Sequence, residues 1–543
     1  MESTTTQNIG VKFKKSFIPY EDLSQISDKD LAYVNKDPRL KPFYKYEAKL
    51  NEFASIIKDK SADKTDRALL SAVLKKQYAD FNVSDATAKN IDLIAKDNTF
   101  TVITAHQPSL FTGPSYFIYK ICSVLNLAKQ LNSKYSDQQI VPVFIMGGED
   151  HDFEEISSTS IFGKKITWEN SVGGSVGKLD TSSLTKVLSE LKELLGDKPT
   201  SAEIYNTIES AFTNFKTYGE GMRYLVNELF GNYGLVIADM SDTALKTLFI
   251  PFIEKEIFER ESINYIQATV DKLESAGFSN QAFPREINFF YLGDGYRERI
   301  VFEENKYKVL NQNLSFSTEE MKAEIKNHPE RFSPNVNMRP IFQEAIFPNL
   351  AYVGGGGELA YWIERKSQFE YFNINYPMLI RRNSVLIIDK GTVKKMKKLE
   401  ININHLLQEE HQVVNAFLDI HSENKLTLDN QKNAISEIFD QIGTLTKKID
   451  ASLIATVEAE KTKQIKSLDN LEGRLKKAEK NKFDVGINQV KSVREKLFPS
   501  NSLQERKENF LTFYTKYGRS YFDYLVENLD PFEKGLMLIQ EDV

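Results

Sequence analysis

The sequence is poor in the features that mark disulfide-rich, secreted and membrane-spanning proteins. It has one cysteine, Cys122, in 543 residues, so no disulfide can form within the chain and a reducing compartment is expected. No segment approaches the roughly 18 consecutive apolar residues of a membrane span. Residues 1–15 also lack the apolar core of a signal peptide. These absences predict a soluble, cytoplasmic protein that does not bind a membrane.

The chain also lacks a surplus of positive charge. Its 70 Lys and Arg residues against 76 Asp and Glu residues give a formal net charge of −6. A protein that follows nucleic-acid phosphates is usually basic, so nucleic acid is not an expected partner. Apolar residues make up 41% of the sequence, which is enough for a substantial core. The length predicts two to four domains at about 150 residues each.

Residues 100–156 have the pattern of a strand, a loop, a helix and a second strand. The β-branched stretch 100–104 predicts a buried strand, and 139–146 is apolar throughout, as in strands covered on both faces. Between them Pro114 suits the first turn of a helix, and apolar residues follow at helical spacing. The unit predicts two parallel strands with a right-handed crossover. Cys122 falls on the apolar helix face, which favours a core residue over a nucleophile.

Polar residues follow both of these strands at their carboxyl ends. In parallel sheets, ligands bind beyond the carboxyl ends of the strands. The first strand is followed by His106 and Gln107, and the second by 147–152, GGEDHD. The sequence therefore predicts a functional site at this edge of the sheet.

Elsewhere the pattern alternates between helical and strand segments, as in an α/β protein. Residues 1–95 are expected to be mostly helical. Further helices are predicted at 184–195, 202–229 and 245–273, a β-hairpin at 161–176, and strands at 234–238, 287–292, 300–310, 346–353, 378–380 and 385–388. We expect an N-terminal segment, 1–95, and a core, 96–390, with insertions at about 157–230 and 240–345.

From residue 393 the sequence pattern changes: apolar residues recur every three or four positions among charged ones. One run covers 393–417 and, after a polar loop, a second covers 435–475. This pattern predicts an antiparallel coiled coil over 391–496, whose second helix of about 50 residues would be roughly 75 Å long. So long a helix offers a surface to a partner, most simply another copy of the chain. The aromatic-rich tail, 497–543, is expected to pack on the core.

Two of the six histidines, His106 and His151, fall in the strand-end loops. There an imidazole can act as a base near neutral pH, although a loop histidine bonded only to backbone is the alternative. The acidic residues of 149–152 can hold an amine, bind a cation or cap a helix. Asp and His also suit metal ions, but no second cluster completes a site of recognised spacing. We therefore expect no tightly bound metal.

Four glycines, 354–357, precede a helical segment that begins with Glu358. Gly355 and Gly356 would let backbone N–H groups approach an anion, although glycine runs also form ordinary turns. Glu358 suits a helix N-terminus whatever the function. Three arginines can each bind a carboxylate or phosphate through two N–H groups, with surface ion pairs as the alternative: Arg339, Arg381 and Arg382.

Four segments carry a specific combination of motifs. They are TAHQPSLFTGPSYFIYK (104–120), PVFIMGGEDHDFEEI (142–156), LAYVGGGGELAYW (350–362) and RRNS (381–384). Together they resemble the bacillithiol-biosynthesis cysteine-adding enzyme family, BshC, and the resemblance extends nearly end to end. Two departures stand out: the family usually has glycine where this chain has Ala105, and proline where it has Gly356. Both affect backbone shape without removing a reactive group.

The resemblance implies a Rossmann-like parallel-sheet core, related to class I aminoacyl-tRNA synthetases and nucleotidylyltransferases, with a dimerising coiled coil. It also implies a ligase that joins the carboxyl group of L-cysteine to the amine of glucosaminyl-malate, the last step of bacillithiol biosynthesis. The cysteine carboxylate needs activation, for which ATP with Mg²⁺ is the candidate. The expected partners are these small molecules and a second copy of the chain.

The residues of this sequence can be matched to that chemistry. His106 or His151 would accept the proton of the amine, with Asp150 or Asp152 holding the ammonium group or orienting the ring. The carboxylates of malate suit arginine side chains. The expected substrate-binding residues are Gln107, Thr112, Gly113, Glu149, Gly355, Gly356, Glu358, Arg339, Arg381, Arg382 and Ser384.

Two other functions remain open on the sequence. The first is a metal-assisted hydrolase that uses the acidic residues 149–152. The second is a non-enzymatic dimeric scaffold whose functional surface is the coiled coil.

Overall fold

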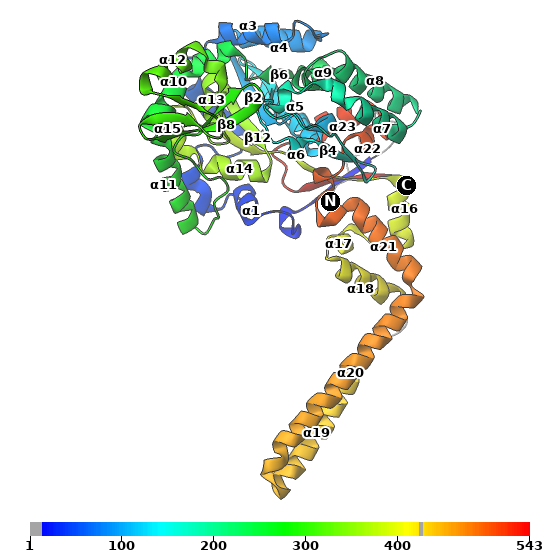
Figure 1. Ribbon diagram of the computed structural model, residues 1–543. Helices are drawn as coiled ribbons and strands as arrows, with labels where there is room; N and C mark the ends of the chain where they lie inside the picture. The colour runs from blue at the N-terminus through cyan, green and yellow to red at the C-terminus, as the bar shows by residue number, and fades with distance from the viewer. Residues whose placement is uncertain (1–12, 423–426, 543) are drawn as a thin grey trace. The chain divides into compact units, whose positions relative to one another are not determined.

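The computed structural model describes residues 13–422 and 427–542. The chain divides into two compact units (Figure 1). The first is built from residues up to 386 and from 502–539, and the second from 387–501 with the last residues of the chain.

A five-stranded parallel sheet forms the centre of the first unit. Its order is β13-β12-β2-β3-β6, and every neighbouring pair is parallel. The chain builds β2, β3 and β6 toward one side, then returns to add β12 and β13 on the other, so the direction reverses between β2 and β12. Such a reversal is the place where α/β sheets bind ligands. The strands are β2 (Thr99–His106), β3 (Gln139–Met146), β6 (Val236–Asp239), β12 (Asn349–Gly354) and β13 (Met378–Arg381).

The strand register aligns the carboxyl ends of these strands. His106 of β2 lies beside Met146 of β3, and Met146 lies beside Asp239 of β6. On the other side Gly354 of β12 pairs with Arg381 of β13. Because β2 and β3 are almost wholly buried, a shift of register would expose core side chains, which fixes this alignment. The predicted strand-helix-strand unit and its parallel sheet are confirmed.

Smaller sheets accompany the central one. An antiparallel sheet has the order β10-β9-β8-β7-β11, a three-stranded sheet has the order β1-β15-β14, and β4 pairs with β5. Their strands are β1 (Phe13–Ile18), β4 (Ser158–Ile161), β5 (Lys164–Thr167), β7 (Phe289–Gly293), β8 (Tyr296–Glu303), β9 (Lys306–Val309), β10 (Leu314–Phe316), β11 (Phe332–Pro334), β14 (Ser384–Ile388) and β15 (Leu536–Glu541).

Helices cover the sheets of the first unit, and α5 is the crossover between β2 and β3 (Figure 1). Cys122 lies on α5 and is fully buried, as the sequence predicts. The helices are α1 (Asp28–Val34), α2 (Phe53–Lys60), α3 (Arg67–Gln77), α4 (Asp85–Ile94), α5 (Tyr116–Lys134), α6 (Phe153–Ile156), α7 (Thr185–Leu195), α8 (Pro199–Thr213), α9 (Tyr218–Phe230), α10 (Thr243–Glu259), α11 (Ser262–Ser275), α12 (Thr318–Asn327), α13 (Arg339–Ile346), α14 (Gly356–Ile363), α15 (Lys366–Tyr371), α22 (Leu511–Tyr517) and α23 (Ser520–Asn528).

Several predicted elements of the first unit are wrong in detail. The hairpin at 161–176 is formed by β4 and β5 and ends at Thr167. The helix predicted over 245–273 is two helices, because Arg260 adopts the left-handed conformation (φ 57°) and ends α10. The helix at 202–229 is likewise two, α8 and α9. Residues 385–388 do not resume β13 after a loop; they form β14, which belongs to the three-stranded sheet.

The second unit is helical in its described residues. An antiparallel coiled coil is present, but its helices are α19 and α20, which lie side by side in Figure 1. The predicted 50-residue helix instead turns back at Ala451–Leu453, because Asp450 leaves helical geometry (φ −154°) and accepts a hydrogen bond from Ser452 N at 2.9 Å. The helices are α16 (Lys390–Lys398), α17 (Ile403–Leu406), α18 (Glu410–His421), α19 (Asp429–Ile449), α20 (Ile454–Lys482) and α21 (Asp484–Leu497).

The described helices include no candidate for a membrane span. Within 13–422 and 427–542, none is both long enough and apolar enough to pass through a bilayer.

A buried ion pair joins α1 to the end of β13. The carboxylate of Asp30 accepts hydrogen bonds from Arg381 Nε at 2.8 Å and Nη2 at 3.0 Å. Gly356, the first residue of α14, lies directly against this carboxylate: a Cβ there would sit 2.0 Å from Asp30 Oδ2. A glycine at position 356 therefore has a local cause, since a side chain there would displace Asp30.

We predict that Gly356→Ala lowers the free energy of unfolding by about 3 kcal/mol, because Asp30 must leave Arg381 and a buried charge loses its partner. Urea unfolding followed by tryptophan fluorescence measures this, since Trp168 and Trp362 are both buried in the first unit. The matched control is Gly357→Ala, where an added Cβ meets no atom within 4 Å. Equal stability of the two variants would contradict the prediction.

Candidate functional site

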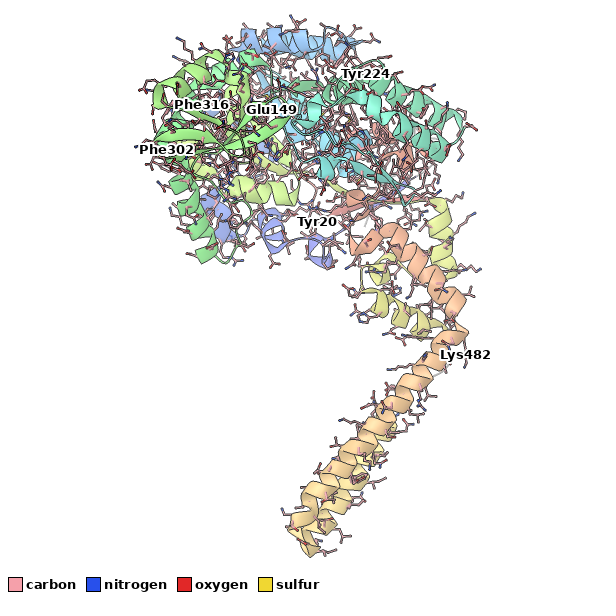
Figure 2. All side chains as sticks on the ribbon, viewed as in Figure 1. Tyr20, Glu149, Tyr224, Phe302, Phe316 and Lys482 are labelled. Carbon is pink, nitrogen blue, oxygen red and sulfur yellow. The ribbon has the colours of Figure 1, made fainter. Side chains whose placement is uncertain are left out.

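A cavity of about 1050 Å³ lies at the carboxyl edge of the central sheet. Its wall includes the ends of β2, β3 and β6, the start of α14 and parts of β7 and β8. Figure 2 labels Glu149, one of its lining residues, within the body of the first unit. Ten of the residues singled out in the sequence line this cavity: His106, Gln107, Glu149, Asp150, His151, Asp152, Arg339, Gly355, Glu358 and Arg382.

Thr112 and Gly113 lie outside the cavity wall. Both adopt left-handed backbone conformations (φ 71° and 65°) in a buried loop that is fixed by the C-terminal tail. Asn509 Nδ2 donates to the carbonyl oxygens of Phe111, at 2.8 Å, and Gly113, at 2.6 Å. These contacts give Thr112 and Gly113 a structural role in shaping the turn between β2 and α5.

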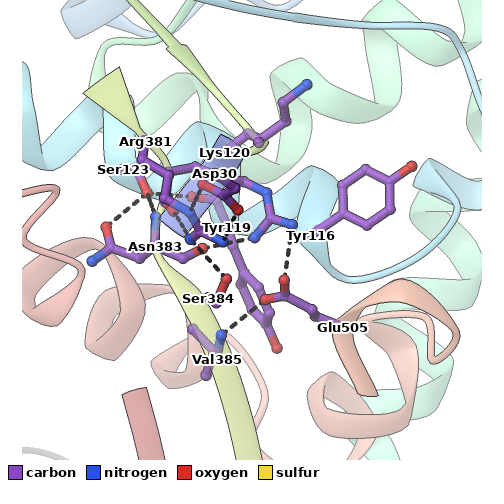
Figure 3. A network of polar contacts seen from close by, with 12 residues as sticks. Asp30, Tyr116, Tyr119, Lys120, Ser123, Arg381, Asn383, Ser384, Val385 and Glu505 are labelled. Carbon is purple, nitrogen blue, oxygen red and sulfur yellow. Dashed lines mark hydrogen bonds and ion pairs between the residues drawn. The ribbon is translucent and has the colours of Figure 1, made fainter. Parts of the chain in front are cut away.

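Arg381 and Ser384 also lie outside the cavity wall, in the polar network of Figure 3. Besides Asp30, the Arg381 guanidinium donates to Ser384 Oγ at 3.1 Å and to the Tyr20 hydroxyl. Asn383 accepts from Ser123 Oγ at 2.9 Å. The loop 381–384 is therefore held by the protein itself, and only Arg382 of the two arginines reaches the cavity.

His106 is held by one backbone and one side-chain contact. Its Nδ1 lies 2.9 Å from the carbonyl oxygen of Gln107, and its Nε2 lies 3.1 Å from the hydroxyl of Tyr116. A carbonyl oxygen only accepts, so the ring proton is on Nδ1 and Nε2 accepts from Tyr116. Burial, helped by the nearby positive charge of Lys120, lowers the pKa of His106 to about 4. His106 is thus neutral at physiological pH, with its lone pair directed at Tyr116.

A partly buried ion pair lies close to His106. Lys120 Nζ donates to Glu358 Oε1 at 2.8 Å and to the carbonyl oxygen of Ala105 at 2.7 Å. Glu358 also accepts from the Gly355 backbone N–H at 2.9 Å and from the Tyr352 hydroxyl at 2.8 Å. Burial alone would raise the pKa of Glu358, but Lys120 and these donors lower it to about 2. Glu358 is therefore a fixed negative charge. It connects the glycine loop, through the Gly355 N–H, to the end of β2, through Lys120.

His151 has the opposite hydrogen-bonding polarity. Its Nδ1 lies 3.1 Å from Arg297 Nη1, closer than the 3.5 Å to Asp150 Oδ1, and a guanidinium can only donate. Nδ1 therefore accepts, the ring proton is on Nε2, and His151 can present a donor to the cavity. Burial raises the pKa of Asp150, but Arg297 and the amide of Gln107 lower it overall. Asp150 is consequently an ionised carboxylate between Arg297 and Gln107.

The remaining acidic residues of this loop are also engaged. Glu149 pairs with the buried ammonium of Lys246 at 2.8 Å and accepts from Ser333 Oγ at 2.9 Å. Asp152 caps α6 by accepting from the Glu155 backbone N–H at 3.2 Å, which is the helix-cap alternative considered for the sequence. Within the part of the chain that the structure describes, no three His, Cys, Asp or Glu side chains gather closely enough to hold a metal ion.

Several residues of the site were not identified from the sequence. Tyr116 and Lys120 lie in the first motif, four positions apart in the first turns of α5, but neither is marked by an unusual pattern. Arg297 and Lys246 come from β8 and α10, far along the chain from 149–152, and only the three-dimensional fold brings them there. The other arginines of the cavity wall are Arg285, Arg299 and Arg506.

Comparison with known proteins assigns the chain to a family. Residues 15–383 match the family described as the N-terminal Rossmann-like domain of the bacillithiol biosynthesis protein BshC, and residues 385–541 match its C-terminal coiled-coil domain. The chain belongs to the BshC family. This confirms the resemblance seen in the four motifs and the fold class, a Rossmann-like core with a coiled coil.

Individual relatives match over nearly their whole length. A "Putative cysteine ligase BshC" from Flavobacterium johnsoniae is 40% identical, covering 96% of this chain and 99% of the relative. A protein of the same name from Christiangramia forsetii is also 40% identical, over 96% of this chain and 98% of the relative. A solved structure of a "putative arginyl t-RNA synthetase" from Campylobacter jejuni aligns with 85% of this chain and 98% of that chain at 10% identity, but its TM-score of 0.21 supports no argument.

We predict that the two histidines are opposite tautomers, which nitrogen-15 NMR of histidine-labelled protein can resolve. His106 should carry its proton on Nδ1 and His151 on Nε2, with signals assigned through His106→Gln and His151→Gln. His106 should remain neutral until about pH 4. The same tautomer at both positions, or protonation of His106 near pH 6.5, would contradict the assignment.

The pKa of His106 also predicts how stability depends on pH. An imidazole in the unfolded chain binds its proton near pH 6.5, whereas His106 in the folded protein does so near pH 4. The unfolded state therefore binds more protons between these values, and the free energy of unfolding falls as the pH falls. His106→Gln should remove roughly 2 kcal/mol of this decline, measured by urea unfolding at pH 7.5 and pH 4.5.

Proposed function

We propose that this protein is a ligase that joins the carboxyl group of L-cysteine to the amine of glucosaminyl-malate. The observation that carries the proposal is the shared cavity of His106, His151 and Asp150 in a chain of the BshC family. Two neighbouring parallel strands deliver an imidazole that accepts and an imidazole that donates, together with an ionised carboxylate. Relatives named as cysteine ligases point to the same chemistry.

The side chains can be given roles in amide formation. The amine must lose a proton before it attacks, and the ionised carboxylate of Asp150 can hold the ammonium group. His106 Nε2, reached through the Tyr116 hydroxyl that lines the cavity, is the proton acceptor. His151 Nε2–H is a donor suited to an oxygen of the acyl group, where negative charge develops during attack. The amine nitrogen would thus form a bond to the acyl carbon while the bond from that carbon to the oxygen of the activating group breaks, and the nitrogen would lose its proton to the protein.

A free carboxylate is a poor electrophile, so the cysteine carboxyl group needs activation. We propose ATP with Mg²⁺ as the activator, which would supply a phosphate-linked leaving group. The protein offers unpaired donors for such a group, since Arg339 Nη1 and Arg382 Nε are buried and lack hydrogen-bond partners. The acidic residues are less suited to the alternative of a metal-assisted hydrolase, because Glu149 is paired with Lys246 and Asp150 lies against Arg297.

Reconstitution tests the proposal. Purified protein with L-cysteine, glucosaminyl-malate and ATP should yield the amide, and mass spectrometry should show AMP or ADP, which identifies the activated intermediate. His106→Ala and His151→Ala should each lower turnover by about 10²–10⁴-fold. His328→Ala is the control, because His328 lies outside the cavity wall and contacts Glu330. Absence of product would refute the ligase, whereas full activity in both variants would refute the roles given to the two histidines.

We also propose that the chain forms a homodimer through α19 and α20. An apolar stripe on α19 remains exposed beside the seam with α20, and its spacing of four, three and four is that of a coiled-coil face. The stripe consists of Ile438, Ile442, Leu445 and Ile449. We expect the same stripe of a second copy of the chain to cover it, because the family resemblance implies a dimerising coiled coil.

Sedimentation velocity tests the dimer. The double variant Ile442→Lys and Leu445→Glu should be monomeric, because charges cannot be buried in the stripe without a partner. The double variant Gln441→Glu and Thr444→Glu changes exposed polar neighbours and should stay dimeric. A dimer in the first variant, or a monomer in the native chain, would place the interface elsewhere or remove it.

A further inference from the structure

The start of α14 faces open space in the cavity. The first N–H groups of a helix have no carbonyl partner within it, and the helix dipole is positive at this end. Gly357 lines the cavity, and a Cβ added to it would meet no atom within 4 Å. Backbone donors and a positive dipole end thus border a volume that a ligand can enter.

Arg382 adds a buried donor beside this helix start. Its side chain is 3% exposed. Its Nη2 pairs with Glu505 at 2.8 Å and its Nη1 donates to the carbonyl oxygen of Asn383 at 2.8 Å. Its Nε has no partner, and it lies 3.5 Å from the position of a Cβ on Gly355. The unused donor therefore lies at the cavity wall next to the glycine loop.

Arg339 brings a positive charge that no carboxylate of the described residues pairs with. Its Nη2 donates to the Tyr361 hydroxyl at 2.7 Å, while its Nη1 is shielded from solvent and makes no hydrogen bond. A shielded charge without a counter-ion is costly, so such an arrangement is stabilised when an anion completes it.

The local charges leave a positive excess at this wall. The cations are Arg339, Arg382 and Lys120, whereas the carboxylates are Glu358, which pairs with Lys120, and Glu505, which pairs with Arg382. Three positive charges against two negative ones leave one, and His106 is neutral. The unpaired charge is that of Arg339.

We propose that Arg339, Arg382 and the start of α14 form a subsite for an anionic group of a substrate, a carboxylate or a phosphate. The identity of the ligand rests on the proposed function: a carboxylate would come from the malate part of the amine substrate, and a phosphate from ATP. Either group carries the negative charge and the acceptor oxygens that this wall lacks. Arg381 is excluded because it pairs with Asp30. Gly356 packs against the same carboxylate, so within the start of α14 it is Gly357 that borders the cavity.

Calorimetric titration of the full chain tests the subsite with L-malate, ADP and inorganic phosphate, and with the neutral diamide of malate as the uncharged probe. At least one of the anions should bind, and the diamide should not. Gly357→Ala, which fills the open space, and Arg339→Met, which removes the charge, should each weaken that binding by about 10-fold or more. Gly473→Ala is the control, because it makes the same change on α20 with equally open space.

The outcomes separate the two sources of the anion. Binding of malate alone assigns a carboxylate, whereas binding of ADP and phosphate alone assigns a nucleotide phosphate. Competition between malate and phosphate assigns one site to both. Failure of all three anions to bind, or equal binding in the native chain and both variants, would overturn the subsite.

Thermal unfolding distinguishes a binding role for Arg339 from a structural one. Without ligand, Arg339→Met should keep or raise the melting temperature, because an unpaired charge is removed. A lower melting temperature with unchanged anion binding would overturn the subsite. The ligase is judged separately by amide formation: anion binding that the variants abolish, in a protein that forms no amide, would refute the ligase alone. Native turnover at low substrate concentration in Gly357→Ala would refute the subsite alone.

Discussion

The ion pair between the buried Lys120 and the partly exposed Glu358 is the constraint on which the candidate site depends. Lys120 reaches from α5 to the backbone of β2, and Glu358 caps the start of α14. One interaction therefore fixes the end of a strand, the crossover helix and the glycine loop in a single arrangement. Removing Glu358 would leave the fully buried charge of Lys120 uncompensated, which is a costly change. The pair also contributes the positive charge that helps to keep His106 neutral.

The sheet brings the two histidines of the candidate site to the same edge. Because β2 and β3 are parallel neighbours in register, His106 and the loop after Met146 begin at the same level. The protein then gives its two imidazoles opposite polarity through fixed partners, a carbonyl oxygen for one and a guanidinium for the other. A ligase needs both a proton acceptor and a donor to developing negative charge. The polarity is set before any substrate binds, which lowers the cost of ordering these groups during the reaction.

The sequence was informative where physical patterns are local. Strand 139–146 was predicted with the bounds of β3, because a short, unbroken apolar run is typical of a strand that is covered on both faces. The coiled coil was predicted, but the turn at Asp450 was missed, because a single capping residue in a long helical pattern is a weak signal. Lys120, Lys246 and Arg297 were not found, because a lysine in an amphipathic helix or an arginine in a strand has no mark of its function. Only the fold shows that their charges are buried beside the cavity.

The two adjacent arginines show why a motif alone cannot assign roles. Arg381 is the last residue of β13, and consecutive side chains of an extended segment point to opposite sides. One side leads to Asp30 and Tyr20, so Arg381 holds α1 to the sheet. The other side leads to the cavity, where Arg382 keeps one unused donor. The adjacent glycines divide in the same way, because Gly356 makes room for Asp30 while Gly357 borders open space. The wall of the cavity and its structural support are therefore built from alternate residues of the same short segments.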